Sequence, residues 1–401
     1  MHLVELELEE FRSYRRLQLH LDPAGLRLVG DNASGKSSLL EAIAMLATTR
    51  SVRTSSEREL IHWRSGEDLS LPPFSRIRGV VTRGDRTIEI EIAIQIEPGR
   101  TSHVKKRIRI NGRPVRVLDA VGSLNAVLFS PEDIELISGS PAGRRRYLDS
   151  TISQLDRSYL RSLARFSRIL EQRNSLLKSL AGSGITAGSR QAGEQLDFWD
   201  AELVAHGSAV IARRVLIVKR LGRLAAERFE LLSMTADLDV RYESSVSLTP
   251  AQVAELVTMD RLQPVVARNF TTALTAARSD ELRRGATLVG PHRDDVTFQL
   301  AGLDVSMHGS RGQQRLVVVA LKLAISALMQ EIADESPVLM LDDVLSELDP
   351  RHQASLLEAT AAAGLQVIVT ATEPSLLRRP VLERIPASRV ASGSILPLDS
   401  L

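Results

Sequence analysis

Alternation of apolar and polar residues predicts β-strands near the start of the chain. VELELEEF (residues 4–11) and TIEIEIAIQIE (87–97) alternate along their length, and the second places its isoleucines on one face. Further on, KKRIRINGRPVRV (105–117) contains Asn111-Gly112, a dipeptide that favours a tight hairpin turn. We therefore expect a β-rich N-terminal region.

Between about residues 141 and 285 the apolar period becomes helical. A first series repeats every seven residues and is followed, after the Gly- and Ser-rich AGSGITAGS (181–189), by a second series with the same period. The series are Leu163, Leu170 and Leu177, then Leu196, Leu203, Val210, Ile217, Leu224 and Leu231. The pattern predicts two long helices in an antiparallel hairpin, with a third helix at 250–277. Packing of these helices on the main core, without a separate arm, is the alternative interpretation.

An α/β pattern returns at about residue 286. The apolar runs VLML (338–341) and LQVIVTATE (365–373) predict buried strands, and the apolar helix expected before them has Ser310 at its cap position. The first run ends in two adjacent carboxylates, Asp342 and Asp343. Burying an unpaired carboxylate is costly. Either the strand simply ends there and Asp343 caps a turn, or the two acids face a cation.

Composition narrows the class of protein. Hydrophobic residues make up 43% of the chain and charged residues 25%, values that are ordinary for a globular protein. The absence of cysteine excludes a disulfide framework and a Cys-ligated zinc site, and it fits a cytoplasmic protein. We expect neither a signal peptide nor a run of membrane-spanning length. The net charge of +2 is small, so any nucleic-acid binding would depend on local patches.

The segment LRLVGDNASGKSSLLEAIAMLATT (26–49) contains a phosphate-binding motif. It fits the pattern G-x-x-x-x-G-K-[ST] between a short apolar strand and an amphipathic helix, with the residues Gly30, Asp31, Asn32, Ala33, Ser34, Gly35, Lys36 and Ser37. Glycine at 30 and 35 permits backbone angles that turn successive amides toward an anion. The Lys36 ammonium is expected to reach the β- and γ-phosphates, and the Ser37 hydroxyl to ligate Mg²⁺. The motif is strong evidence for nucleotide binding.

This motif explains the two acids. In phosphate-loop proteins an apolar parallel strand ends in an Asp that holds Mg²⁺, which is the role expected of Asp342. Asp343 could orient or deprotonate the attacking water. We therefore expect an ATPase head built from both chain ends, with a lobe at 1–140 and a lobe at 286–401. A helical arm at 141–285 would lie between them in sequence.

Several motifs together resemble the RecF family of ABC-type ATPases, which belongs to the SMC-like group. SRGQQ (310–314) stands 28 residues before Val338, where such proteins have their signature loop, and SELD (346–349) stands in the place of the D-loop. GDNASGKSSLLEAI, FSPEDIELISGSPAGRRRYLD (129–149), GPHRDD (290–295) and LDDVLSELD follow the order of that family over nearly the whole chain.

The resemblance implies a fold, a ligand and partners. It implies an α/β fold, an ABC-type phosphate-loop ATPase head with an inserted α-helical arm, which binds ATP with Mg²⁺ and dimerises when ATP is bound. Ser310, Arg311, Gly312 and Gln313 would then meet the ATP of the other protomer. It further implies DNA binding in recombinational gap repair, replication and the SOS response. RecO and RecR would be partner proteins, and RecA the recombinase whose loading they assist.

Departures from the ABC pattern point to a weak ATPase that acts as a switch. Ala33 stands where glycine is frequent, and Asp343 replaces the usual glutamate, which suggests slow turnover. Thr370 or Thr372 stands in the place of the switch histidine, and no glutamine lies near Ser130 to Asp133. These differences concern hydrolysis and leave ATP binding as expected.

Two groups of basic residues are candidates for DNA contact. Lys105, Arg107 and Arg109 share one face of a predicted strand, although a charged solvent face is the alternative. Arg144 begins a run of three arginines, for which intraprotein ion pairs are the alternative. Rival functions are a transporter ATPase subunit, a small-molecule kinase and a scaffold that uses ATP structurally. The 310 − 37 = 273 residues between Ser37 and Ser310 argue against the first.

Overall fold

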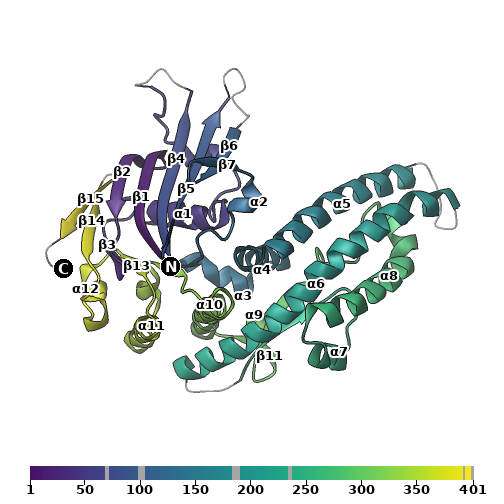
Figure 1. Cartoon of the computed structure of the whole chain (residues 1–401). Coiled ribbons are helices and arrows are strands. Elements are labelled where there is room, and N and C mark those ends of the chain that lie inside the picture. The colour runs from purple at the N-terminus through teal and green to yellow at the C-terminus, as the bar shows by residue number, and fades with distance from the viewer. Residues whose placement is uncertain (68–71, 98–103, 183–189, 234–236, 392, 399–401) are drawn as a thin grey trace. The chain divides into compact units, whose positions relative to one another are not determined.

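The computed structural model describes the chain except for residues 68–71, 98–103, 183–189, 234–236, 392 and 399–401 (Figure 1). The described residues form two compact units. The first contains residues 1–134, 227–236 and 315–401, and the second contains 135–226 and 237–314. The first unit therefore draws on both ends of the chain.

An antiparallel sheet forms one part of the first unit. Its order is β2-β1-β4-β5-β6-β7, and its strands are β1 (His2–Phe11), β2 (Tyr14–His20), β4 (Phe74–Arg83), β5 (Arg86–Ile96), β6 (Val104–Ile110) and β7 (Arg113–Val115). The alternation seen in the sequence separates the two faces: Leu6 and Leu8 are fully buried, whereas Glu7 on the other face pairs with Arg78 at 2.8 Å. Asn111 and Gly112 both have positive φ and connect β6 to β7, as the hairpin prediction requires.

A mostly parallel sheet forms the other part. Its order is β15-β14-β3-β13-β12-β8, and its strands are β3 (Gly25–Val29), β8 (Ala126–Phe129), β12 (Val338–Asp342), β13 (Val367–Ala371), β14 (Ala387–Ala391) and β15 (Ser394–Leu398). Helix α1 (Lys36–Thr48) contacts strands of both sheets and is buried from Leu39 to Ala47. The strand that leads into the phosphate loop and the strand that ends in the acids are not neighbours, because β13 lies between them.

Further elements complete the first unit. They are α11 (Pro350–Ala362), α2 (Val117–Ala120), α12 (Pro374–Leu377) and the 3-10 turns η1 (Glu57–Leu60), η2 (Pro131–Ile134), η3 (Val344–Glu347) and η4 (Pro380–Leu382). Helix α10 (Arg311–Ala333) begins in the second unit and continues into the first.

Helix α10 differs from the expectation that the chain has no apolar run of membrane-spanning length. It is long and apolar enough to cross a membrane by length and composition, with a mean hydropathy of 1.9, although no such run was expected. However, 67% of this apolar window is buried inside the protein, as in a core helix.

The second unit is mainly helical. Its helices are α3 (Glu135–Ser138), α4 (Pro141–Leu155), α5 (Arg157–Gly182), α6 (Arg190–Ser233, whose last turns belong to the first unit), α7 (Pro250–Glu255), α8 (Met259–Arg284) and α9 (Val305–His308). A small sheet, β11-β10-β9, consists of β9 (Leu238–Glu243), β10 (Asp295–Leu300) and β11 (Leu303–Asp304). Because β10 pairs with β9, residues 286–314 belong to this unit, whereas the sequence placed 286 onward in the head.

The predicted helices exist, with two differences. Leu177 and Leu180 pack against Leu196, whereas Phe166 lies in a cluster with Leu203, so α5 and α6 are antiparallel. The turn predicted at 181–189 lies largely outside the described residues. Leu231, the last residue of the heptad series, is 68% exposed, so the buried seam ends before it. The third predicted segment consists of two helices, because α7 ends at Glu255 and α8 begins at Met259.

Candidate nucleotide-binding site

The loop between β3 and α1 has the backbone of a phosphate-binding loop. Gly35 has a φ of 116°, and Ala33 has a φ of 63°, a left-handed conformation that costs a non-glycine residue about 1 kcal/mol. Gly30 does not have positive φ, contrary to the reason given for it from the sequence. Its constraint is space, because a Cβ there would lie 2.5 Å from the carbonyl oxygen of Val390.

Lys36 is buried at the start of α1 and faces the loop. Its Nζ donates hydrogen bonds to the carbonyl oxygens of Gly30 at 2.6 Å and Asp31 at 2.9 Å. Burial lowers the pKa of Lys36, and the nearby carboxylates of Asp343 and Asp342 oppose this shift. The ammonium and the two acids at the end of β12 therefore lie within electrostatic range of each other.

Ser37 and Asp342, which are 305 residues apart in the sequence, are in direct contact. Ser37 Oγ donates to Asp342 Oδ1 at 3.0 Å, and Thr370 Oγ1 donates to the same oxygen at 2.9 Å. Thr370 Oγ1 in turn accepts from the backbone N–H of Asp343 at 3.0 Å. The intervening strand β13 thus supplies a hydroxyl that contacts both acidic residues, and of the two threonines considered from the sequence it is Thr370.

The two acids lie in different environments. Burial raises the pKa of Asp342, and the hydrogen bonds from Ser37 and Thr370 counteract part of the shift. Asp343 has left-handed backbone angles (φ 53°, ψ 20°) and stands before η3, where its side chain makes no cap hydrogen bond. Its Oδ1 is buried without a hydrogen-bond partner in the described structure. Turn capping therefore does not account for this carboxylate, and the fold itself supplies no partner for its buried oxygen.

A turn after β8 reaches the same edge of the sheet. Phe129 pairs with Leu341, so Ser130 lies level with Asp342 across the parallel ladder. Asp133 accepts from the Ser130 N–H at 2.6 Å and forms an ion pair with the buried Lys322 of α10 at 2.7 Å. Glu132 remains exposed, and its charge raises the pKa of Asp342. From the sequence, this segment was considered only as a place for a glutamine. Neither the ion pair between Asp133 and Lys322 nor the position of Glu132 near Asp342 was predicted.

The signature segment is exposed and well ordered by its own contacts. Ser310, Arg311, Gly312 and Gln313 are all exposed. Gln313 N–H donates to Ser310 Oγ at 3.2 Å, and Ser310 N–H donates to Gln313 Oε1 at 2.8 Å, which is a reciprocal capping box. The cap position expected for Ser310 is confirmed. Because Ser310 Oγ only accepts in this pair, its O–H remains available to donate to another group.

The D-loop segment continues directly from the acids. Ser346 Oγ donates to the carbonyl oxygen of Asp343 at 2.7 Å, and Glu347 forms an ion pair with Arg315. Asp349 caps α11 by accepting from the N–H groups of Arg351 and His352.

The candidate DNA-contacting residues differ in their contacts. Lys105 and Arg107 are exposed on β6, and Arg109 pairs with Glu91 at 3.1 Å. Arg144 forms a two-bond ion pair with Asp295, with N–O distances of 2.8 and 2.7 Å, and also donates to two backbone carbonyl groups. Its guanidinium is thus occupied within the second unit, and these contacts support the ion-pair alternative over a contact with DNA.

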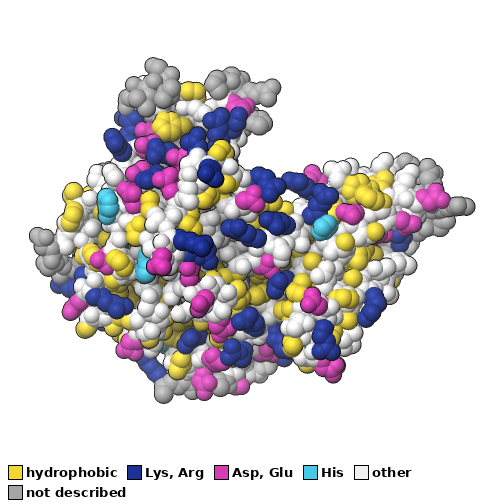
Figure 2. Space-filling model, in the orientation of Figure 1, with side chains coloured by type: hydrophobic (Ala, Val, Ile, Leu, Met, Phe, Trp, Pro, Cys, Tyr) yellow, Lys and Arg dark blue, Asp and Glu magenta, His cyan; other side chains and the backbone are white. Residues whose placement is uncertain are grey.

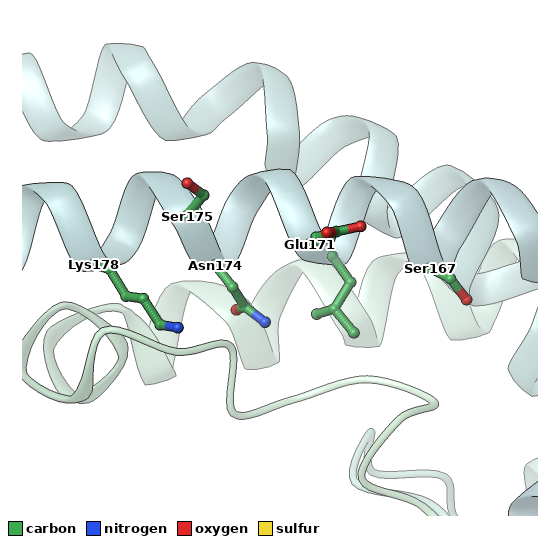
Figure 3. A pocket seen from close by; sticks show the side chains of 6 residues that line it. Ser167, Glu171, Asn174, Ser175 and Lys178 are labelled. Carbon is green, nitrogen blue, oxygen red and sulfur yellow. The ribbon is translucent and has the colours of Figure 1, made fainter. Parts of the chain in front are cut away.

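A cavity of about 460 Å³ lies along α5 and contains no residue of the phosphate loop or the acid strand. Figure 3 shows Lys178 and Asn174 pointing toward a loop beside the helix, whereas Ser175 points away from it. Asn174 Oδ1 accepts from the N–H and the hydroxyl of Thr287, at 2.8 and 2.7 Å. Asn174 thus has a structural role at this cavity.

Curated sequences similar to this chain share one description. The family model described as RecF/RecN/SMC N terminal domain matches residues 2–384. The "DNA replication and repair protein RecF" of Thermomicrobium roseum is 46% identical and covers 98% of both chains. The protein of the same name from Chloroflexus aurantiacus is 42% identical and covers 98% of this chain and 99% of its own.

Solved structures with a similar fold include a member of the same family. A structure of the recombination mediator protein RecF with ATP, in the RecFOR pathway, has a TM-score of 0.84 at 29% identity and covers 99% of this chain and 97% of that one. An SMC head bound to a winged-helix domain of ScpA has a TM-score of 0.51 at 16% identity, which concerns the fold alone. The expected α/β fold class, an ABC-type ATPase head of the SMC kind, is confirmed.

Proposed function

We propose that this chain, which belongs to the RecF family, is an ATP-dependent DNA-binding protein of recombinational gap repair and DNA replication. ATP binding would join two protomers head to head on DNA, and slow hydrolysis would release them. Participation in the SOS response and action in the cytoplasm are part of the same proposal.

The contact between Ser37 and Asp342 carries the proposal. Two oxygens from opposite ends of the chain lie 3.0 Å apart beside a buried lysine and beside a carboxylate oxygen without a partner. No structural need of the fold accounts for gathering these charges, whereas a magnesium-bound triphosphate does.

The residues present fit Mg²⁺. This ion prefers oxygen ligands, keeps several waters and is commonly held by one or two protein groups together with phosphate oxygens. Ser37 and Asp342 would be those protein groups. When bound, Mg²⁺ would neutralise charge on the phosphates, and Thr370 would hold the Asp342 carboxylate in place.

Slow hydrolysis follows from the residues around Asp343. We propose that Asp343 orients the attacking water, and its short side chain places the carboxylate further from that water than a glutamate would. Thr370 or Thr372 would stand in the place of the switch histidine, and a threonine hydroxyl does not accept a proton as an imidazole does. Hydrolysis would therefore act as a timer.

ATP would act by mass action on the dimer. The exposed signature segment, Ser310 to Gln313, would contact the γ-phosphate of ATP bound to the other protomer, so that ATP binds the paired state more tightly than the single chain. RecO- and RecR-type mediators would then join this complex to assist loading of a RecA-type recombinase.

The test is the size of the particle in solution. Light scattering of the wild type is expected to show a monomer that becomes a dimer when ATP and Mg²⁺ are added. Lys36→Ala should remain monomeric under the same conditions, because the γ-phosphate loses its main cation. Dimers of Lys36→Ala with the ATP response of the wild type would contradict the proposal.

A further inference from the structure

A row of arginines lies along the first half of α5. Arg157, Arg161, Arg165 and Arg168 are all exposed, and they follow each other at intervals of four, four and three residues. At 3.6 residues per turn these intervals keep the four side chains within a sector of about 80°. We call them the arginine stripe. Figure 2 shows Lys and Arg side chains in dark blue on one face of the molecule.

The stripe is not neutralised along its own helix. Like charges three or four residues apart destabilise a helix, and the stripe contains three such pairs. The one acidic residue at a compensating spacing is Glu171, three residues after Arg168. Among the described residues, Arg157, Arg165 and Arg168 have no ion-pair partner. Arg161 differs from them because it has an interaction within the chain.

Arginine-rich composition alone does not explain this arrangement. Several other arginines of the second unit pair with carboxylates, whereas exposed ones such as Arg146, Arg261 and Arg268 have no ion pair among the described residues. The paired arginines are Arg144, Arg173, Arg213, Arg214, Arg278 and Arg283. The stripe differs from these other arginines by its grouping, because its exposed arginines lie within one sector of a single helix with one acid, Glu171, at a compensating spacing.

We infer that the arginine stripe binds the phosphate backbone of a nucleic acid, an inference that rests on the proposed function and gives its DNA contact a surface. The stripe spans about 16 Å of helix, a length over which one strand of duplex DNA presents roughly five phosphates. Guanidinium groups bind phosphate oxygens through two hydrogen bonds and are weakly hydrated, which suits repeated backbone contact without base recognition. A nucleic-acid backbone offers negative charge at a regular spacing along its length, so it can meet several arginines of the stripe at once.

The experiment compares two triple variants of the full chain. Arg157→Ala/Arg165→Ala/Arg168→Ala removes three stripe arginines and leaves Arg161, which has its own contact. Arg261→Ala/Arg268→Ala/Arg284→Ala removes the same charge from exposed positions of α8. Binding of a labelled duplex of about 30 base pairs is measured with ATP between about 50 and 200 mM salt. Melting curves and ATP-dependent sizing monitor the fold and the dimer.

The logarithm of DNA affinity is expected to fall linearly with the logarithm of salt concentration. In the stripe variant the magnitude of this slope should be smaller than in the wild type by about two to three, whereas the α8 variant should keep the wild-type slope. Equal losses in both variants, or an unchanged slope in the stripe variant, would overturn the inference. Equal competition by polyglutamate would also overturn the assignment to nucleic acid. A stripe variant that loses DNA but still dimerises with ATP supports the inference, whereas a wild type that neither dimerises nor binds DNA would contradict the proposed function as well.

Discussion

At the scale of single residues, the nucleotide site contains carboxylates that are partly buried, and burial disfavours their charged form. Asp342 is half-buried, Asp343 has a buried oxygen without a partner in the described structure, and the charge of the exposed Glu132 acts on Asp342. Burial raises the pKa of Asp342 above its ordinary value. Sites adapted to bind a cation commonly reduce stability in this way.

Asp342→Asn should therefore stabilise the protein at neutral pH while weakening Mg²⁺-dependent ATP binding. A carboxyl whose pKa is raised on folding binds its proton more tightly in the folded state, so wild-type stability falls as pH rises from the ordinary pKa through the raised one. Asn has no such cost and still offers an acceptor to Ser37 and Thr370. We expect a melting temperature about 2–4 °C above wild type at pH 7, and a difference that shrinks toward pH 4.

Asp349→Asn provides the control with the opposite sign. Hydrogen bonds from His352 and the backbone lower the pKa of Asp349, so its contribution to stability is present at neutral pH and is lost as pH falls through the lowered value. This variant should melt below wild type at pH 7. An Asp342→Asn variant that melts lower as well would show that the carboxylate stabilises the fold and would remove the argument for strain at the site.

The residues of the nucleotide site could be assigned from the sequence, but most of the contacts that surround them could not. Lys36, Ser37 and Asp342 could be assigned because the phosphate-loop pattern fixes residue types at fixed spacing. The choice between Thr370 and Thr372 depended on where β13 ends and which of its residues pairs with Asp342, and a strand pattern without its register leaves both open. The pairing of Arg144 with Asp295 was equally out of reach, because 151 residues separate them.

At the scale of elements, a buried ion pair fastens α10 to the turn after β8. The Lys322 side chain is 2% exposed, and its Nζ donates to Asp133 Oδ1 at 2.7 Å and to the carbonyl oxygen of Leu128. The same Asp133 holds the turn that carries Glu132 toward the end of β12. The helix that follows the signature segment is thus connected to the edge of the nucleotide site.

Lys322→Met should destabilise the protein by about 3 kcal/mol, because it leaves the Asp133 carboxylate without its cation. Adding Asp133→Asn should restore part of that loss, since the amide can still accept from Ser130 and carries no charge. Denaturant unfolding of the wild type, both single variants and the double variant measures the coupling. If Asp133→Asn costs as much in the Lys322→Met background as in the wild type, the two side chains are not coupled.

The elements themselves were predicted best where one physical pattern dominates. Alternation identified β1 and β5 because each has one buried face, and the heptads identified α5 and α6 because their seam is continuous. Prediction was weaker where contacts are distant. The pairing of β9 with β10 assigns residues 286–314 to the helical unit, and the sequence gives no local sign of that pairing.

At the scale of the whole molecule, the phosphate loop and the signature segment belong to different compact units, and a full ATP site in our proposal needs two chains. Lys36→Ala should lack ATP binding, whereas Ser310→Arg should bind ATP as a monomer and fail to pair, because a bulky cation replaces the capping hydroxyl. Each variant alone then gives no ATP-dependent dimer.

A mixture of the two variants separates pairing in trans from a defect within one chain. The Ser310→Arg protomer keeps an intact phosphate loop, and the Lys36→Ala protomer keeps an intact signature segment, so a heterodimer contains one complete ATP site. Light scattering with ATP should therefore show dimers in the mixture, at a higher ATP and protein concentration than the wild type needs because one sandwiched nucleotide replaces two. Dimers of Ser310→Arg alone at wild-type ATP sensitivity, or no dimers in the mixture at any concentration, would contradict contact in trans.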